Sequence, residues 1–147
     1  MTERTSKRWW KRPVTLVAGG VLLLVLLLAG AEIWIGIKIR RTIEREAAAL
    51  TGGIIAQQIS GKAAVTVENR LLDKVKRITP ESVAALSPEE IQSCGMSMKK
   101  ARNIRSAAEA VLAGTLPIGR FPEMSDAEVV EQLSALPGIG VWTAEML

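Results

Sequence analysis

Histidine is absent from this chain of 147 residues, and Cys94 is its only cysteine. The absence of histidine excludes a histidine general base and a histidine-ligated metal. A single cysteine excludes an internal disulfide and a four-cysteine zinc or iron–sulfur site within the chain. Because no histidine is present to activate the thiol, we interpret Cys94 as a small buried residue and not as a nucleophile.

Acidic side chains are scarce only in the first third of the chain. Residues 1–49 carry nine Lys and Arg against four Asp and Glu, a net charge of 9 − 4 = +5. Residues 50–147 carry ten against eleven, which is −1 and brings the total to the formal +4. The basic character therefore belongs to the N-terminal segment. Charge gives no indication that the remainder binds nucleic acid.

Charged side chains are missing altogether from Pro13 to Ala31, a run of 19 residues. A helix of that length rises about 28 Å, close to the thickness of the hydrocarbon layer of a bilayer. Apolar residues resume after Glu32, and tryptophans flank the segment as interfacial aromatics do, at Trp9, Trp10 and Trp34. These features predict a transmembrane helix or signal anchor over residues 13–39, preceded by a basic polar N-terminus over residues 1–12.

Two properties of this apolar segment stay open. Ala29-Gly30-Ala31 has the form of a signal-peptide cleavage site, but the long polar lead and the apolar residues up to Ile39 favour an uncleaved anchor. Basic residues lie on both flanks, so the orientation is unresolved. We expect a single-pass, membrane-anchored protein. A helical linker over residues 40–53 follows, which Thr51-Gly52-Gly53 is expected to end.

The remainder, residues 54–147, shows no useful run of alternating apolar and polar residues. Apolar residues instead recur at helical steps, first at Ile55, Ile59, Ala63, Val67, Leu71 and Val75. Thr79-Pro80 and Ser87-Pro88 have the form of an N-cap followed by proline at the first helical position. Ser125-Asp126-Ala127-Glu128 is a capping box, and Lys99 to Ala113 indicates a longer helix. The sequence predicts an all-α domain.

Two glycines enclose one apolar residue in Leu136-Pro137-Gly138-Ile139-Gly140, ahead of a helix that begins near Val141. Glycine permits a tight turn, including positive φ. N–H groups left unpaired at the start of the second helix suit an anion such as a DNA phosphate, because the helix dipole is positive there. Such binding reads no bases. On the turn alone, an ordinary αα-corner in which Ile139 fills the space between two helices explains the pattern equally well.

Four motifs, in order, resemble those of the 3-methyladenine DNA glycosylase II family of the helix-hairpin-helix superfamily. Leu136 to Met146 resembles the hairpin of that family, and Ile55 to Ser60 resembles its early Gln-Gln-Ile-Ser helix. Cys94 to Ala101 resembles its glycine turn before a Lys-Ala helix, and Gly114 to Pro117 resembles the segment that follows. The resemblance implies a helix-hairpin-helix glycosylase-like domain over residues 54–147.

The activity implied by the resemblance is base excision: hydrolysis of the N-glycosidic bond of an alkylated base, flipped out of the duplex. Bifunctional relatives carry a Schiff-base lysine just before the Thr-Ala pair of the hairpin. Trp142 stands at that position, which implies a monofunctional enzyme that uses water. The catalytic Asp of the family lies beyond the position of Leu147. We therefore expect a truncated domain without a catalytic residue, preceded by an unrelated transmembrane segment.

The expected DNA contacts come from the hairpin, from the Gln-Gln-Ile-Ser motif and from a basic stripe on the Lys99 helix. They are Leu136, Gly138, Ile139, Gly140, Val141, Thr143, Gln57, Gln58, Ser60, Lys99 and Lys100. A solvated helix face is the alternative for the two lysines. Capping and packing are the alternative for the motif residues, and packing against the first hairpin helix is the alternative for Trp142.

The expected partners are double-stranded DNA, through its phosphate backbone and an alkylated base, and a membrane; no protein partner is identifiable. No metal or other cofactor is expected, although the resemblance allows a monovalent cation at the hairpin carbonyls. Members of the family are cytoplasmic, in contrast to the predicted anchor. The alternative function is a single-pass membrane protein whose non-catalytic helical module binds DNA or a partner.

Overall fold

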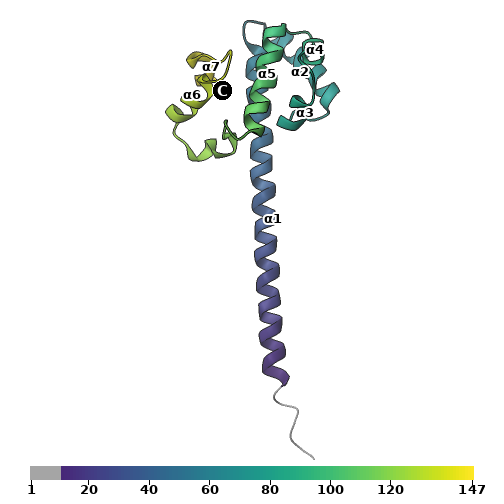
Figure 1. Ribbon diagram of the computed structural model, residues 1–147, viewed down its shortest axis with the longest axis vertical. Coiled ribbons are helices and arrows are strands. Elements are labelled where there is room, and N and C mark those ends of the chain that lie inside the picture. Colours follow the sequence, from purple (N-terminus) through teal and green to yellow (C-terminus); the bar gives the residue numbers. More distant parts are fainter. Residues whose placement is uncertain (1–10) are drawn as a thin grey trace, which may run out of the picture. The chain divides into compact units, whose positions relative to one another are not determined.

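The computed structural model describes residues 11–147, with side chains from residue 19 onward. The chain divides into an N-terminal unit that ends at Lys38 and a second unit, Ile39–Leu147. Every regular element in residues 11–147 is a helix, as Figure 1 shows, so the all-α prediction is confirmed for this part of the chain. Trp9, Trp10 and most of the predicted basic N-terminus lie outside the described residues.

Helix α1 spans Lys11–Ala56, and all its side chains from Gly19 to Lys38 are exposed. The leucines from Leu22 to Leu28 each expose 56–62% of their surface. By length and composition alone, the stretch Gly19–Ala56 could cross a membrane. The Nζ atom of Lys38 lies 5.5 Å from the centroid of the Trp34 ring, a cation–π arrangement. The described part of the N-terminal unit, residues 11–38, is thus one stretch of helix, and its side chains from Gly19 onward give it a largely apolar surface.

The last turns of α1 belong to the core of the second unit. Five of their side chains are buried, namely Ala47, Leu50, Thr51, Ile54 and Ile55. Residues 40–53, predicted to be a linker, are therefore a structural part of the domain. The expectation that Thr51-Gly52-Gly53 ends the helix is also wrong, because α1 continues to Ala56.

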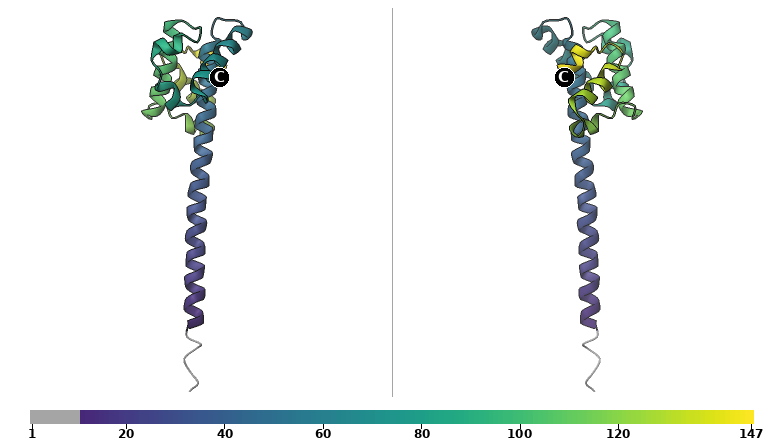
Figure 2. Two further views of the ribbon diagram at one scale, coloured as in Figure 1. Left: turned by 90° about the vertical axis from the view of Figure 1, so that its right-hand side faces the viewer. Right: turned by 90° about the vertical axis from the view of Figure 1, so that its left-hand side faces the viewer.

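Tertiary packing explains why the glycine pair does not break α1. A Cβ atom on Gly53 would lie 2.0 Å from Cδ2 of Leu147, so the absence of a side chain lets the C-terminal leucine approach. Figure 2 shows the C-terminus beside the last turns of α1. Thr51 Oγ1 also donates to the Ala47 carbonyl at 2.8 Å. These contacts outweigh the weak helix propensity of glycine.

Three helices follow: α2 (Gly61–Val75), α3 (Pro80–Ala84) and α4 (Pro88–Gln92). Their N-caps are Ser60, Thr79 and Ser87. The side-chain oxygens of these residues accept hydrogen bonds from backbone N–H groups in the first turn of each helix. The N-caps predicted at Thr79 and Ser87 are confirmed. Capping depends on residues three apart, which is why the sequence predicts it well.

The stripe predicted from Ile55 to Val75 is partly wrong. The helix is interrupted between Ala56 and Gly61, and this break changes the face that each later residue presents. Ile59 is 40% exposed and Ala63 is exposed, whereas Ala64 is buried.

Helix α5 (Met98–Leu112) packs against α3 and α4. Ile104, Ala107 and Ala108 on its inner face are buried, but Leu112 at the C-terminal end is 50% exposed. A 3₁₀ helix η1 (Ile118–Glu123) leads to α6 (Asp126–Ser134), whose predicted capping box is confirmed. The last helix, α7 (Val141–Glu145), packs against α6. The core joins these elements through side chains such as Ile54, Leu71, Ile104, Ile118, Leu133 and Ile139.

Candidate nucleic-acid interface

The turn between α6 and α7 has the backbone conformation that its glycines permit. Gly138 has φ of +82°, in the left-handed region that favours glycine. Gly140 is the N-cap of α7 with φ of −87° and ψ of 167°, and a Cβ there would meet nothing within 4 Å. Ile139 lies between them with only 4% of its surface exposed. The turn therefore buries its apolar residue and leaves both glycines at the surface.

Backbone N–H groups at the start of α7 are free of protein partners. Within residues 11–147, no hydrogen bond uses the N–H of Gly140, Val141 or Trp142 as a donor, and no side chain caps α7. The N–H of Ile139, in contrast, donates to the Leu136 carbonyl at 3.2 Å and closes the turn. Exposed, unpaired amides at the start of a helix provide donors for an anion.

The side chain of Gln57, which follows α1, lies against this turn. Its Nε2 donates to the Gly138 carbonyl at 2.9 Å and lies 3.5 Å from Oγ1 of Thr143. Thus the structure brings together three of the predicted site residues from positions more than 80 residues apart. The side-chain donor of Gln57 is directed at the protein and not at solvent.

Gln58 and Ser60, which follow Gln57 in the motif, differ in the roles of their side chains. Gln58 is exposed and has φ of +58°, a conformation uncommon for residues other than glycine. Ser60 is the N-cap of α2, and its Oγ accepts from the N–H of Ala63 at 3.3 Å. Of the alternatives for this motif, capping describes Ser60, while Gln58 keeps its side chain at the surface.

The two predicted lysines of α5 have different surroundings. Lys99 is exposed. Lys100 is half-buried, and its Nζ donates to the Ile55 carbonyl at 2.8 Å and to the Gln57 carbonyl. Desolvation by burial lowers the pKa of Lys100. Because its ammonium satisfies carbonyls at the end of α1, Lys100 is an internal cap and not a free phosphate ligand.

Two residues beside the turn were not among the predicted contacts. Asn103 of α5 adjoins Gly138 so closely that a Cβ built there would lie 1.8 Å from its Nδ2. Asn103 follows Lys100 by three residues, so helical periodicity places both on one face. Trp142 is 72% exposed, so the alternative that its ring is packed against the first hairpin helix is wrong.

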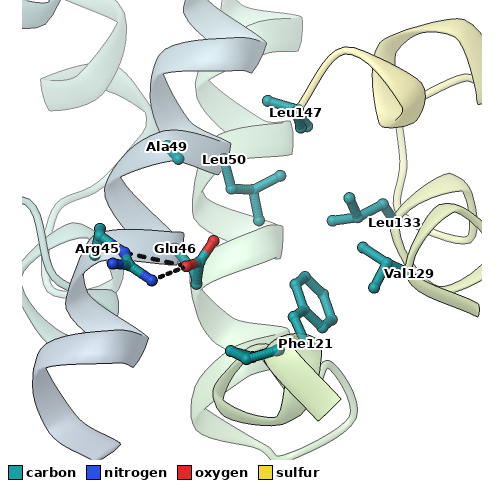
Figure 3. A pocket seen from close by; sticks show the side chains of 9 residues that line it. Arg45, Glu46, Ala49, Leu50, Phe121, Val129, Leu133 and Leu147 are labelled. Atoms are coloured by element: carbon teal, nitrogen blue, oxygen red, sulfur yellow. Dashed lines mark hydrogen bonds and ion pairs between the residues drawn. The ribbon is translucent and has the colours of Figure 1, made fainter. Parts of the chain in front are cut away.

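A cavity of about 350 Å³ lies between α1, η1 and α6. Figure 3 shows its labelled lining, with Leu50, Phe121, Val129 and Leu133 pointing inward and Leu147 at one edge. Arg45 and Glu46 contribute its only charges, and they pair with each other at 2.9 Å. The cavity is therefore an apolar space without a free acid or base.

The acidic side chains of α6 and α7, the helices before and after the turn, cap a helix or are exposed. The Glu128 carboxylate accepts from the N–H and Oγ of Ser125, and these hydrogen bonds lower its pKa. Asp126 lies in the same first turn of α6, and Glu145 of α7 is exposed. Among the described residues no group of three or more His, Cys, Asp or Glu side chains could hold a metal ion.

Comparison with known proteins identifies relatives of one kind. The profile of the HhH-GPD superfamily base excision DNA repair proteins matches residues 51–142. DNA-3-methyladenine glycosylase 1 of Schizosaccharomyces pombe is 34% identical over 102 residues, which cover 67% of this chain and 45% of that protein. DNA-3-methyladenine glycosylase 2 of Escherichia coli is 33% identical over 93 residues, 61% of this chain and 32% of that protein.

Solved structures with the same fold include the DNA-3-methyladenine glycosidase of Bacillus halodurans, with a TM-score of 0.62 at 34% identity. That match covers 68% of this chain and 47% of the other. The 3-methyladenine DNA glycosylase of Schizosaccharomyces pombe, in complex with abasic DNA, gives 0.64 at 32% identity and covers 73% of this chain and 55% of the other. The chain spans less than half the length of the curated relatives that it matches.

Proposed function

Since the chain belongs to the HhH-GPD superfamily of base excision DNA repair proteins, we propose that it acts on duplex DNA in base-excision repair. The single observation that carries the proposal is the turn before α7, where three exposed amides have no protein acceptor in the described chain. A phosphate oxygen accepts hydrogen bonds from such N–H groups. Gly140 has no side chain, so the DNA backbone can come close to its amide. This contact positions the protein on DNA without reading its sequence.

The proposed contact surface extends beyond the turn by three exposed side chains, Gln58, Lys99 and Trp142. Lys99 adds a cation for a phosphate, and the Trp142 ring adds an aromatic face on which an unstacked base can stack. The free amides of Gly140 and Val141 remain the central contact, and the backbone of Gly138 and Ile139 forms the turn that precedes them. Four partly buried residues support this surface, namely Leu136, Gln57, Thr143 and Lys100, while the exposed Ser60 caps α2.

The substrate that we propose is an alkylated base, as in 3-methyladenine DNA glycosylases, and the reaction is hydrolysis of its N-glycosidic bond. Trp142 cannot form a Schiff base, which supports monofunctional chemistry with water. The Glu128 carboxylate is engaged by Ser125, and Asp126, Glu131 and Glu145 are exposed, so we assign the bond-breaking carboxylate to none of the acidic residues of α6 and α7. Residues 51–142 thus contribute DNA recognition to the proposed reaction.

A monovalent cation at the hairpin is a smaller part of the proposal. The Gly138 carbonyl accepts a hydrogen bond from Gln57, which directs a positive dipole at this oxygen. The Leu136 carbonyl likewise accepts from the Ile139 N–H, but each carbonyl oxygen has two lone pairs, so the carbonyls of Leu136, Gly138 and Ile139 each keep at least one lone pair for the ion. Bound there, the ion would neutralise a DNA phosphate beside the turn.

The DNA function is tested by titrating the full chain, in mild detergent, with a labelled duplex at several salt concentrations. We expect Lys99→Gln to reduce the slope of log K against log salt by about 0.9, the value for one lost phosphate contact. Lys74→Gln is the matched control, since Lys74 lies near the far end of α2, about 20 Å along the helix from Ser60. Salt-independent binding by the parent chain, or equal slopes for both variants, would contradict the proposal.

We propose further that the N-terminal unit anchors the protein in a membrane, which the uniformly exposed apolar surface of Gly19–Lys38 supports. The parent chain is expected in the membrane pellet after alkaline extraction. Leu23→Arg with Leu27→Arg should release it, because an arginine at the bilayer centre costs about 2.5–3.5 kcal/mol on insertion scales. DNA binding then requires that residues 39–147 lie on the side of the membrane that contains DNA.

The matched control for the anchor is Val65→Arg with Leu72→Arg, which places two charges on the exposed surface of α2. This pair should leave the protein in the pellet. Recovery of the parent chain in the supernatant would remove the anchor from the proposal while leaving the DNA function untouched. A parent chain that stays in the pellet but never binds duplex would instead favour the alternative, a membrane protein with a non-catalytic helical module.

A further inference from the structure

The side chain of Gln57 joins the end of α1 to a turn 81 residues further along the chain. The Gly138 carbonyl can only accept a hydrogen bond, so the amide NH₂ group, and not the amide oxygen, must face it. The Thr143 hydroxyl, 3.5 Å from the same nitrogen, lies on the first turns of α7. One amide group therefore contacts both the loop and the second helix of the hairpin.

The backbone of Gln57 is itself held in place. Lys100 of α5 donates from one ammonium group to the carbonyls of Ile55 and Gln57. These carbonyls lie at the C-terminal end of α1, where four carbonyls lack intrahelical partners and the dipole is negative. The ammonium therefore both satisfies acceptors and places a positive charge at the negative end of the helix. The consequence is that the position of Gln57 depends on α5.

The same helix also touches the hairpin directly. Asn103, one turn after Lys100, lies against the Cα of Gly138 on the side where any other residue would carry its Cβ. The hairpin turn is thus enclosed by Gln57, which follows α1, and by Asn103 of α5. No side chain caps α7, so no capping residue holds the amides of Gly140 and Val141 in place.

We infer that Gln57 is a positioning residue: by binding Gly138 and Thr143 it sets the direction of the free amides at the start of α7. This inference rests on the proposed DNA binding, which gives those amides their ligand. Lys100 acts one step further away, through the backbone of Gln57. Loss of the Gln57 amide leaves the fold and every cation in place but lets the hairpin reorient.

The test compares Gln57→Ala and Gln57→Glu with the parent, using the full chain in mild detergent. Glutamate keeps the size of the side chain but, when ionised, cannot donate to Gly138. We expect duplex affinity to fall about tenfold, the equivalent of roughly 1.4 kcal/mol. The salt slope should not change, because no phosphate-binding cation is removed. The matched control is Gln92→Ala, which truncates an exposed glutamine of α4.

Hydrogen exchange supplies a readout that does not depend on DNA. The Ile139 N–H, which closes the turn by donating to Leu136, should exchange about tenfold faster in both Gln57 variants, because local opening costs less free energy. Amides of the α5 core around Ile104 should keep their parent rates. A purely structural role would instead accelerate both segments together. Lys100→Met should also speed exchange at the Ile139 N–H. In the double variant with Gln57→Ala, the two increases in exchange rate should not add.

Unchanged exchange at Ile139 together with unchanged affinity would overturn the positioning role. If Ile139 exchanged faster in the Gln57 variants but the parent chain bound no duplex, the positioning of the hairpin would be supported and the DNA function refuted. Reduced affinity in Gln57→Ala with a reduced salt slope would also overturn the inference, because it would mean that a phosphate-binding cation had been lost.

Discussion

Gly138→Val is expected to unfold the hairpin and to destabilise the domain by about 2–4 kcal/mol. Valine is branched at Cβ and is strongly disfavoured at φ of +82°, so the backbone must change its conformation. A Cβ at this position would in addition lie 1.8 Å from Nδ2 of Asn103. Thermal unfolding of the full chain in detergent measures the effect, at about 4–8 °C for each kcal/mol in a domain of this size.

Two further variants separate the causes of this loss. Adding Asn103→Ala to Gly138→Val removes the close contact but not the positive φ, so it should recover only part of the stability. Gly140→Ala, with an ordinary φ of −87° and open space around its Cβ, should change stability by less than about 0.5 kcal/mol. It should still weaken duplex binding, because the added methyl group faces the proposed phosphate. Equal stability of Gly138→Val and Gly140→Ala would refute the described turn.

Ile139→Ala is expected to cost about 2–4 kcal/mol, the range for truncating a buried isoleucine. Ile139 is 4% exposed and belongs to the core that joins α6 and α7 to the rest of the domain. Its removal leaves a cavity at the point where the turn meets the core. The free energy of unfolding, obtained from denaturant titration of the full chain, is the quantity to compare with the parent.

Ile139→Val should cost only about 0.5–1.5 kcal/mol, because one methyl group is lost and the side chain keeps its branched shape. Ile59→Ala is the surface control: Ile59 is 40% exposed, so its truncation should have a smaller effect than that of Ile139. If Ile139→Ala and Ile59→Ala lowered the free energy of unfolding by the same small amount, Ile139 would not connect the hairpin to the core.

The hairpin illustrates why the two largest expected effects fall on neighbouring residues of opposite character. Gly138 is exposed and contributes a positive φ to the turn. Ile139 is buried and contributes an apolar contact between the two helices. A single turn thus combines a backbone conformation that glycine adopts readily with a packed side chain, and the exposed amides follow directly after it. Both variants should therefore reduce stability and duplex binding together, unlike Gly140→Ala.

Local features of the domain were predictable from short stretches of sequence. The N-caps at Thr79, Ser87 and Ser125 depend on side chains that reach backbone groups three residues away, so neighbouring residues suffice to identify them. The Gly-Ile-Gly turn was likewise predictable, because its need for positive φ is local. The burial of Cys94 agrees with the expectation for a thiol without an activating partner.

Long-range contacts decided the features that the sequence did not predict. The helix across Gly52 and Gly53 persists because its neighbours are buried and Leu147 packs over Gly53. Lys100 looked like one of several basic residues on a solvated stripe, yet its ammonium binds carbonyls 43 and 45 residues earlier. The residue type identifies Lys100 as a donor, and only the fold shows its acceptors.

The amino-acid sequence alone determined the helical class of the domain, the start of most helices and the presence of a glycine turn, because each depends on interactions within a few residues. Tertiary structure decided which predicted contacts remain available to a ligand. Gln57 and Lys100 carry donors suited to DNA, but their hydrogen bonds are made within the protein. Whether a donor is free is a property of its surroundings, and these come from segments distant in the chain.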